Sequence, residues 1–388
     1  MFKGKSILVF GGGSLQISII KLCKQLGLKT IVIDPDCKAE GQKFADSFEV
    51  IDGNDFEGTC RIVEKYNIKA IITAATDKPL VMMARIAEKY SFPFFPVETA
   101  ISSTDKYKMK QIFRKNNIPC AQGILINHIV ENLNYPLILK PRDNSGSRGV
   151  IYCKNKNDAE NAIHEVKQHT NTDTILAEEY IDGKEFSIEC LHSKNETNIV
   201  QITEKITTPL PYNVELGHIQ PVELTQNTIE TIQELIFKIA HSFHFQNCAS
   251  HTELKINERG IFIIETSPRL GGDFITSHLV PLSTGVYIEK ELIALSLDQK
   301  ISISKKSNDA SAVFYFDFDE GVIKELPNLA LLKKIKGVVD IKLNLKKGML
   351  INKITSSLDR YGYFILHGKS RKEIFELKNL ITSQIKIN

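Results

Sequence analysis

The chain has 388 residues, of which 42% are hydrophobic, 24% are charged and 8% are aromatic. This length and apolar content exclude a disordered chain and predict a large buried core, divided into about two to three domains. The formal net charge of +3 gives no electrostatic argument for a nucleic-acid or membrane partner.

The sequence also gives no sign of a membrane anchor, a leader or a disulfide framework. No apolar stretch approaches the roughly 18 residues that a membrane-spanning helix needs. The start, MFKGKSILVFGGGSLQ, has a positive flank, but its apolar run breaks at Gly11 without a small-residue cleavage site. The seven cysteines are scattered and form no CxxC pair. We therefore expect a cytoplasmic protein.

The first hundred residues alternate between strand and helix patterns. Apolar runs predict strands at 6–10, 30–34, 69–74 and 93–97. Amphipathic helices are predicted between them, directly after Gly13 and at 55–66 and 79–90. Buried strands that alternate with such helices are typical of a doubly wound parallel sheet, so residues 1–102 are predicted to form an N-terminal α/β domain.

The pattern changes after residue 102. We predict a basic helix at 104–117, a strand at 135–140, antiparallel strands within 185–205, a long helix at 228–244, a hairpin at 251–265 and a last helix at 371–383. These elements predict three further domains, at 103–180, 181–309 and 310–388.

Two glycine-bearing loops could contact anions. Gly11, Gly12 and Gly13 lie between a strand and a helix, but Gln16 replaces the third glycine of a GxGxxG motif, so close strand–helix packing explains this turn as well. The second loop, LKPRDNSGSRGV at 139–150, is more informative. Lys140 could reach a phosphate oxygen, and the small residues after it could cover phosphates with backbone N–H groups. The loop is not a P-loop, because the GxxxxGK[ST] pattern is absent and the lysine precedes the glycines. Its alternative interpretation is a mobile surface hairpin.

Two glutamates, Glu253 and Glu265, lie on the two strands of the predicted hairpin. A three-residue turn at 258–260 would place them opposite each other, whereas a turn of two or four residues would send them to different faces. Facing carboxylates repel unless a cation lies between them, and carboxylate oxygens suit Mg²⁺ bridging phosphates. Arg269 adds a positive fork close by. The alternative is an ordinary hairpin with two exposed acids.

A further acidic segment runs from Glu178 to Glu185 around a glycine turn. It could be a hinge whose backbone recognises a purine while an acid holds ribose hydroxyls. Taken alone, the pattern favours a solvated strand edge.

Taken in chain order, these groups resemble the ATP-grasp superfamily of carboxylate–amine ligases over nearly the whole chain. The series starts at Thr104-Asp105-Lys106 and ends at the string ETSPRLGGD, which occupies 265–273 and is most similar to the L-amino-acid (dipeptide) ligase branch. Residues 321–323 and 359–362 resemble the C-terminal domain of that branch. The resemblance implies an N-terminal doubly wound α/β domain, an ATP-grasp fold of two α+β lobes and a small C-terminal α+β domain.

The resemblance also implies the role of each residue. ATP would be contacted by two lysines, the glycine loop, the hinge and a ribose-binding acid: Lys106, Lys140, Ser145, Gly146, Ser147, Gly149, Glu178, Glu179, Ile181 and Glu185. The metal ligands would be Glu253, Glu265 and Ser267, the last at a position where the family usually has Asn. Arg269 would be catalytic, because it would stabilise an acyl phosphate and the transition state that forms it.

Four residues are candidates for contacting a substrate: Asp77, Glu215, His218 and Gly271. Glu215 and His218 resemble an acid–histidine pair that dipeptide ligases place near their substrates. The alternative is that they belong to a polar loop packed on the long helix.

The implied activity is an ATP-dependent ligase that phosphorylates a carboxylate and couples it to an amine, with release of ADP and phosphate. Its cofactors would be ATP and Mg²⁺, with Mn²⁺ as an alternative metal, and its partners two small molecules and, as in many family members, a second copy of the chain. Two alternatives stay open. One is a nucleotide-pathway or carbamoyl-phosphate-type ATP-grasp ligase, and the other is a non-catalytic ATP-binding relative.

Overall fold

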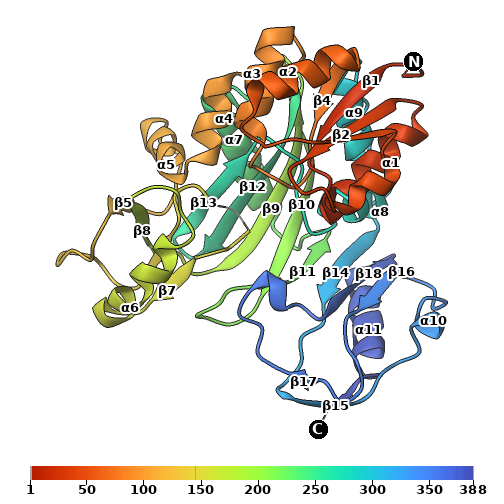
Figure 1. Ribbon diagram of the computed structural model, residues 1–388. Helices are drawn as coiled ribbons and strands as arrows, with labels where there is room; N and C mark the ends of the chain where they lie inside the picture. Colours follow the sequence, from red (N-terminus) through yellow and green to blue (C-terminus); the bar gives the residue numbers. More distant parts are fainter. Residues whose placement is uncertain (1, 145, 388) are drawn as a thin grey trace.

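The computed structural model describes residues 2–144 and 146–387 (Figure 1). The chain begins with a parallel sheet of strand order β3-β2-β1-β4. Its strands are β1 (Ser6–Phe10), β2 (Lys29–Asp34), β3 (Ser47–Val50) and β4 (Ile68–Ile72). The helices around it are α1 (Ile17–Gln25), α2 (Phe56–Lys65), α3 (Leu80–Tyr90) and α4 (Val97–Thr104).

Side chains of β1 alternate between two cores, as expected for a strand that helices cover on both faces. Leu8 and Phe10 pack in a core with α2 and α3, whereas Ile7 and Val9 pack in a second core with α1. The predicted doubly wound sheet is thereby confirmed.

Two details of this part differ from the prediction. The strand expected at 93–97 is wrong, because Pro93 and Pro96 lack the N–H donors that a ladder needs, and α4 begins at Val97. The short edge strand β3 was not expected.

The turn at Gly11–Gly13 is closed by the protein itself. The backbone N–H of Gly12 donates to Asp34 Oδ2 at 2.7 Å. A Cβ atom on Gly12 would lie 3.2–3.3 Å from Ala39, Phe48 and Val32. Close packing therefore explains this glycine.

A small antiparallel sheet of order β5-β8-β6-β7 forms the first lobe after the N-terminal sheet. Its elements are α5 (Lys106–Lys115), β5 (Gly123–Ile126), β6 (Leu137–Lys140), β7 (Ile151–Cys153), α6 (Lys156–Lys167) and β8 (Ile175–Glu179). The apolar face of α6 packs on this sheet, with Ala159, Ile163 and Val166 against Leu137 and Leu139.

The largest sheet is antiparallel, with strand order β13-β12-β9-β10-β11-β14-β18-β16. Its strands are β9 (Lys184–His192), β10 (Thr197–Thr207), β11 (Glu215–Gln220), β12 (Cys248–Asn257), β13 (Gly260–Ser267), β14 (Ala310–Tyr315), β16 (Val338–Leu343) and β18 (Gly362–Gly368). One face packs on α7 (Gln226–Ser242), and the other packs on α8 (Val280–Thr284) and α9 (Ile288–Ser296).

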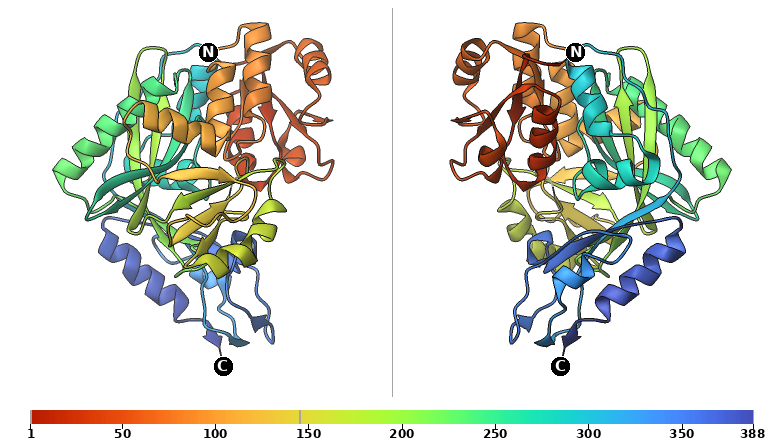
Figure 2. Two further views of the ribbon diagram at one scale, coloured as in Figure 1. Left: turned by 90° about the vertical axis from the view of Figure 1, so that its left-hand side faces the viewer. Right: turned by 90° about the vertical axis from the view of Figure 1, so that its right-hand side faces the viewer.

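This sheet continues through residue 310, because β11 pairs with β14. The C-terminal segment adds a small sheet of order β17-β15-β19 and two helices. These elements are β15 (Gly321–Glu325), α10 (Leu329–Leu332), β17 (Leu350–Ile351), α11 (Arg371–Thr382) and β19 (Lys386–Ile387). They lie at the opposite end of the molecule from α2 and α3 (Figure 2). No helix within the described residues is long and apolar enough to cross a membrane.

Candidate active site

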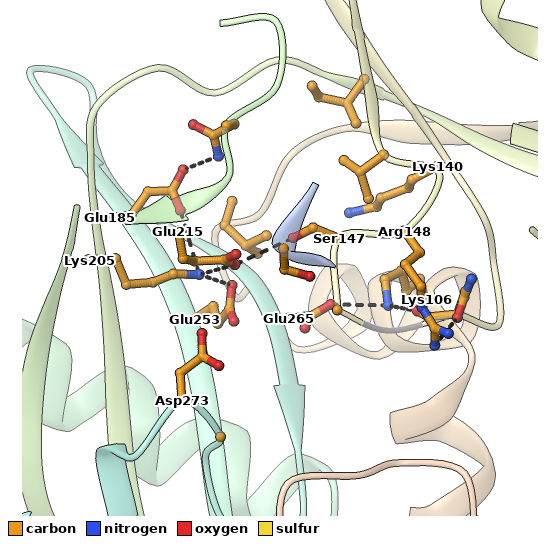
Figure 3. A pocket seen from close by; sticks show the side chains of 18 of the residues that line it. Lys106, Lys140, Ser147, Arg148, Glu185, Lys205, Glu215, Glu253, Glu265 and Asp273 are labelled. Atoms are coloured by element: carbon orange, nitrogen blue, oxygen red, sulfur yellow. Dashed lines mark hydrogen bonds and ion pairs between the residues drawn. The ribbon is translucent and has the colours of Figure 1, made fainter. Parts of the chain in front are cut away.

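A cavity of about 490 Å³ lies where the N-terminal sheet, the small lobe, the large sheet and the C-terminal segment meet (Figure 3). Many of the residues singled out in the sequence line it: Asp77, Lys106, Lys140, Gly146, Ser147, Glu178, Glu179, Ile181, Glu185, Glu215, His218, Glu253, Glu265 and Arg269. Figure 3 shows Lys106, Lys140 and Arg148 on one side and Glu185, Glu215 and Glu253 on the other. Basic groups of the small lobe thus face acidic groups of the large sheet.

Lys106 is the first residue of α5. Asp105 caps this helix by accepting hydrogen bonds from the backbone N–H groups of Tyr107 and Lys108, at 3.0 and 3.1 Å. The Lys106 ammonium lies 3.1 Å from Glu265 Oε2 and donates to the Asn144 carbonyl at 2.7 Å. Burial alone would lower the pKa of Lys106, but Glu265, together with Asp77 and Glu253, raises it. Lys106 is therefore a positive charge fixed beside the glycine loop.

Lys140, at the end of β6, shares one carboxylate with a second lysine. Glu178 forms ion pairs with Lys140 and with Lys110, whose Nζ atom lies 2.6 Å away, and all three side chains are almost fully buried. Two ammonium groups against one carboxylate leave a local excess of positive charge. Glu178 lines the cavity, but both of its carboxylate oxygens form ion pairs with lysines.

Lys110 was missed in the sequence. It lies four residues after Lys106 on the same helix face, a spacing that could have revealed it.

The hinge is held by ion pairs of its acids. Glu185 Oε1 accepts from Asn213 at 2.8 Å and lies 2.9 Å from Lys255 Nζ. Burial would raise the pKa of Glu185, but Lys205 and Lys255 hold it below its usual range. At the other end of the hinge, Glu179 pairs with Arg259 at 2.7 Å. Both acids are therefore held in place by basic partners.

Glu253 and Glu265 are cross-strand partners on β12 and β13. The turn does not have the three residues that we expected, because Asn257 pairs with Gly260 across a two-residue turn. A β-bulge between Glu253 and Leu254 makes up the difference, since Leu254 pairs with Ile263 and the next pair is Glu253 with Glu265. The expected pairing occurs for a different reason.

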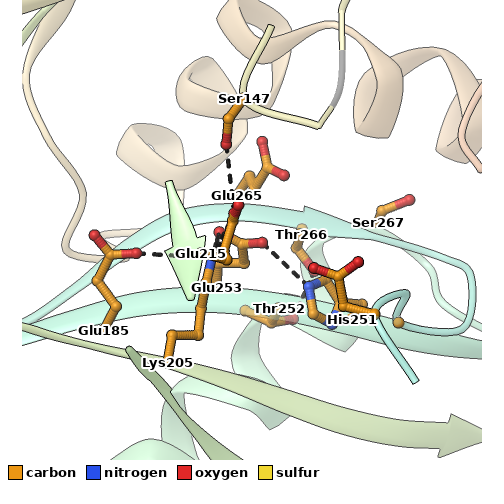
Figure 4. A network of polar contacts seen from close by, with 12 residues as sticks. Ser147, Glu185, Lys205, Glu215, His251, Thr252, Glu253, Glu265, Thr266 and Ser267 are labelled. Carbon is orange, nitrogen blue, oxygen red and sulfur yellow. Dashed lines mark hydrogen bonds and ion pairs between the residues drawn. The ribbon is translucent and has the colours of Figure 1, made fainter. Parts of the chain in front are cut away.

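The two glutamates suit a metal ion that a nucleotide also binds. Within the described residues, no group of three or more His, Cys, Asp or Glu side chains could hold a metal by itself. Mg²⁺ in nucleotide sites needs only one or two carboxylates together with phosphate oxygens. Glu253 and Glu265 provide that number at one place in the cavity (Figure 4).

Ser267 lies apart from these two glutamates. Its hydroxyl donates to Asp77, and its side chain points away from Glu265 (Figure 4). Ser267 instead lines a second cavity of about 510 Å³ on the other side of Lys106.

Arg269 follows β13 and lines the cavity, where a contact with Asp77 orients its side chain. Its Nε atom donates to Asp77 Oδ1 at 2.9 Å. Burial disfavours both charges, but each lies beside the other, so the pKa of Asp77 is lowered and that of Arg269 is raised. Asp77 thus anchors the arginine in its observed orientation.

The part of the cavity beside the C-terminal segment, here called its far end, holds Glu215, His218, Asp273 and Arg360. Arg360 comes from the C-terminal segment and lies 3.2 Å from Glu215 Oε2 and 3.1 Å from Asp273 Oδ2. Its guanidinium stacks on the Tyr315 ring at 3.8 Å. His218 Nε2 lies 3.4 Å from Asp273. Although burial favours the neutral acid, His218 and Arg360 hold the pKa of Asp273 well below its usual range.

Glu215 and His218 are both near this end, but each contacts a different partner. A register shift opposite Ile206 and Thr207 allows both side chains to face the cavity. Arg360, Asp273 and the central lysine Lys205 were not singled out in the sequence. Lys205 lies in a strand that alternates polar and apolar residues, TNIVQITEKIT, so its charge gave no signal of its own.

Lys205 lies among three carboxylates. Its Nζ atom is 2.8 Å from Glu253, 3.5 Å from Glu215 and 3.7 Å from Glu185. Burial would lower its pKa, but these acids raise it well above the ordinary value. Lys205 therefore links the hinge, the proposed metal ligand and the far end.

Besides Ser267, two predicted residues in the described part of the chain, Gly149 and Gly271, do not line this cavity. A Cβ atom on Gly149 would lie 2.8 Å from His169, at a backbone φ of +73° that favours glycine. The backbone N–H of Gly271 donates to the buried Glu189 at 3.2 Å. Ser145 lies outside the described residues. The neighbouring Ser147 hydroxyl donates to Glu215 at 3.4 Å and so connects the glycine loop to the large sheet.

Comparisons with known proteins agree with this geometry. Residues 133–277 match the ATP-grasp domain, and residues 314–388 match the L-amino acid ligase C-terminal domain 2. The chain is 24% identical to an L-arginine-specific L-amino acid ligase of Bacillus subtilis, over 74% of this chain and 72% of that protein.

Two solved structures share the fold over nearly the full length. The L-amino acid ligase from Bacillus licheniformis has a TM-score of 0.84 at 18% identity, covering 100% of this chain and 99% of that one. The phosphoribosylglycinamide synthetase from Anaerococcus prevotii has a TM-score of 0.75 at 24% identity, covering 99% of each chain. The chain therefore contains an ATP-grasp domain at 133–277 and an L-amino acid ligase C-terminal domain 2 at 314–388.

Proposed function

We propose that the protein activates the carboxylate of an amino acid with ATP and joins it to the amino group of a second amino acid. The observation that carries this proposal is one cavity that contains Lys106, Lys140, the Glu253–Glu265 pair and Arg269. The C-terminal segment, which supplies Arg360 to the same cavity, matches the domain found in L-amino acid ligases. The product would be an amide, with release of ADP and phosphate.

ATP would lie between the small lobe and the large sheet. Lys106 and Lys140 would contact its phosphates, and the backbone of Gly146, Ser147 and Gly149 would cover them with Ser145. The backbone of the hinge at Glu179 and Ile181, next to Glu178, would bind adenine, and Glu185 would bind the ribose hydroxyls. Glu253 and Glu265 would hold Mg²⁺, or Mn²⁺ in its place, and the bound ion neutralises phosphate charge.

The first chemical step forms an acyl phosphate. A carboxylate oxygen of the first substrate attacks the γ-phosphorus, and the bond from that phosphorus to the β-phosphate oxygen breaks, so that ADP leaves. Arg269, held by Asp77, stabilises the negative charge that develops on the transferred group. Lys106 adds a second fixed positive charge.

The second step forms the amide. The neutral amine of the second substrate attacks the acyl carbon, the carbon–oxygen bond to phosphate breaks, and the nitrogen loses a proton. Water would destroy the acyl phosphate, so the glycine loop must close before the amine attacks. The contact of Ser147 with Glu215 gives this loop a partner on the large sheet.

The far end of the cavity favours an amino acid over a phosphoribosyl substrate. Glu215 and Asp273 share the single guanidinium of Arg360 there. Lys205, 3.5 Å from Glu215, is likewise already paired with Glu185 and Glu253. The carboxylates here would repel a phosphate group, whereas the ammonium group of an amino acid is complementary to them. We therefore place the ammonium-bearing end of a substrate beside Glu215, His218 and Asp273.

Isotope transfer tests the acyl phosphate directly. An amino acid that supports ADP release is supplied with a heavy oxygen isotope in its carboxylate, and the inorganic phosphate is analysed by mass spectrometry. The proposed route moves one labelled oxygen into phosphate for each amide formed. Unlabelled phosphate in the presence of amide product would contradict it.

A further inference from the structure

Glu189 and His251 lie side by side on β9 and β12, and His251 lines the cavity. They are cross-strand partners in the register of these two strands. The Glu189 side chain is fully buried, and the His251 side chain is 7% exposed. A buried carboxylate costs free energy of folding unless it is paired, so the partners of Glu189 indicate what it does.

The contacts of His251 lead to the proposed metal ligand. Its Nδ1 atom lies 2.5 Å from Glu189 Oε1, and its Nε2 atom lies 3.2 Å from Glu253 Oε1. Both ring nitrogens face carboxylate oxygens, so each donates a hydrogen bond. Figure 4 shows the contact between His251 and Glu253. Glu253 is therefore held at one oxygen by His251 and at the other by Lys205.

The other oxygen of Glu189 leads to the loop that carries Arg269. Glu189 Oε2 accepts from the backbone N–H of Gly271 at 3.2 Å. A Cβ atom on Gly271 would lie 2.8 Å from both oxygens of Glu189 and from His251 Nδ1. Only glycine lets the loop approach this closely. The loop after β13 thus rests on the Glu189–His251 pair, two residues beyond Arg269.

We infer that Glu189 and His251 are a positioning pair that holds the metal ligand Glu253 and the Arg269 loop in a fixed relation. The inference rests on the proposed function, because it takes Glu253 as a metal ligand. Hydrogen bonds to a ligating carboxylate fix its orientation before the ion arrives, and their removal weakens metal binding. The pair does not touch the reacting atoms. It acts through Glu253 and through the backbone of Gly271.

Calorimetry of ADP binding, with and without Mg²⁺, separates this role from simple support of the sheet. The test variants are Glu189→Gln and His251→Gln, which keep the size of the side chains but cannot form both hydrogen bonds as charged groups. The matched control is His192→Gln. His192 is also fully buried on β9, but its ring contacts Thr197 and Ser250, at 3.0 and 2.7 Å.

We expect Mg²⁺ to tighten ADP binding in the wild type and in His192→Gln. In the two test variants the Mg²⁺ concentration needed for this gain should rise about tenfold or more, while ADP affinity without Mg²⁺ stays the same. Excess Mg²⁺ should restore the gain. An unchanged Mg²⁺ dependence in both test variants would overturn the inference.

A third variant covers the case in which the buried substitutions prevent folding. Gly271→Ala acts on the same pair from the loop, without backbone strain, because the φ angle of Gly271 lies outside the left-handed region. Its control is Gly272→Ala, where a Cβ would meet only Ala75 at an ordinary 3.6 Å. Gly271→Ala should weaken the Mg²⁺ effect, and Gly272→Ala should preserve it. Equal Mg²⁺ effects in the two variants would contradict the inference, whereas no Mg²⁺ effect in the wild type would contradict the proposed function itself.

Discussion

Glu253 and Glu265 face each other across the β12–β13 hairpin only because a bulge corrects the register that the turn sets. Leu254 pairs with Ile263 according to the two-residue turn, and the same register would pair Glu253 with Ile264. The bulge passes over Ile264 and places Glu265 opposite Glu253. A local irregularity of the strand thus assembles the proposed metal site.

Glu265→Gln should abolish ADP formation without unfolding the protein. The substitution removes one of the two facing charges and leaves Lys106 without its carboxylate partner. We expect the rate of ADP formation to fall about 100-fold or more. The melting temperature should change little, because the Glu265 side chain is 24% exposed. The control is Glu258→Gln, on the exposed turn of the same hairpin. Full activity of Glu265→Gln, or its unfolding, would count against the metal-ligand role.

Arg269→Lys should separate catalysis from nucleotide binding. Lysine keeps the charge but cannot reproduce the planar fork that Asp77 orients. We expect kcat to fall about 100-fold to 1,000-fold, with the affinity for ADP unchanged. Steady-state kinetics and calorimetry measure the two quantities. Arg61→Lys, on α2 away from the cavity, is the control, and an equal loss of ADP affinity in Arg269→Lys would refute this assignment.

Arg360→Met should impair substrate binding rather than nucleotide binding. Methionine keeps much of the apolar stem but leaves Glu215 and Asp273 without their shared cation. We expect the KM for an amino-acid substrate to change about tenfold, with ADP affinity preserved. Arg371→Met is a matched control, because Arg371 also belongs to the C-terminal segment but pairs with Glu204 at 2.8 Å. An unchanged KM would remove Arg360 from the substrate end.

Glu289 should make stability depend on pH. It lies buried on α9, where it accepts a hydrogen bond from Ser18 of α1 at 2.7 Å, and burial raises its pKa to about 7 from 4.5. Between these values the folded protein keeps a proton that the unfolded chain releases, so stability falls as the pH rises. The loss is about 3 kcal/mol above pH 7.

Glu289→Gln should remove this loss. In urea unfolding, the variant should be about as stable as the wild type at about pH 5 and more stable at about pH 8. Glu291→Gln, at a half-buried position two residues further along α9, is the control. Parallel stability curves for Glu289→Gln and the wild type would show that Glu289 is ionised throughout.

The chain order of the motifs and the alternation of strands with helices made the fold predictable. These are local patterns, and most of the site residues that the sequence and its resemblance to the ATP-grasp family singled out line the cavity. The strand expected at 93–97 failed because its prolines outweigh its apolar character. Contacts between distant elements could not be predicted, because periodicity does not show which strands become neighbours. Two examples are the contact of Arg360 with Glu215 and the contact of His251 with Glu189.

Some expectations from the sequence are not tested by the structure of a single chain. The homodimer, the cytoplasmic location and the four domain limits stay predictions. The hairpin shows what residue patterns do not predict. Glu253 and Glu265 face each other because of a β-bulge, and no residue pattern in the sequence indicated that bulge.

ADP release with ATP and Mg²⁺, measured against single and paired amino acids with mass spectrometry of the products, tests the central claim most directly. The account predicts release that depends on a particular pair and a product whose mass is the sum of the two minus water. ATP binding without ADP release from any pair would contradict a ligase that joins amino acids.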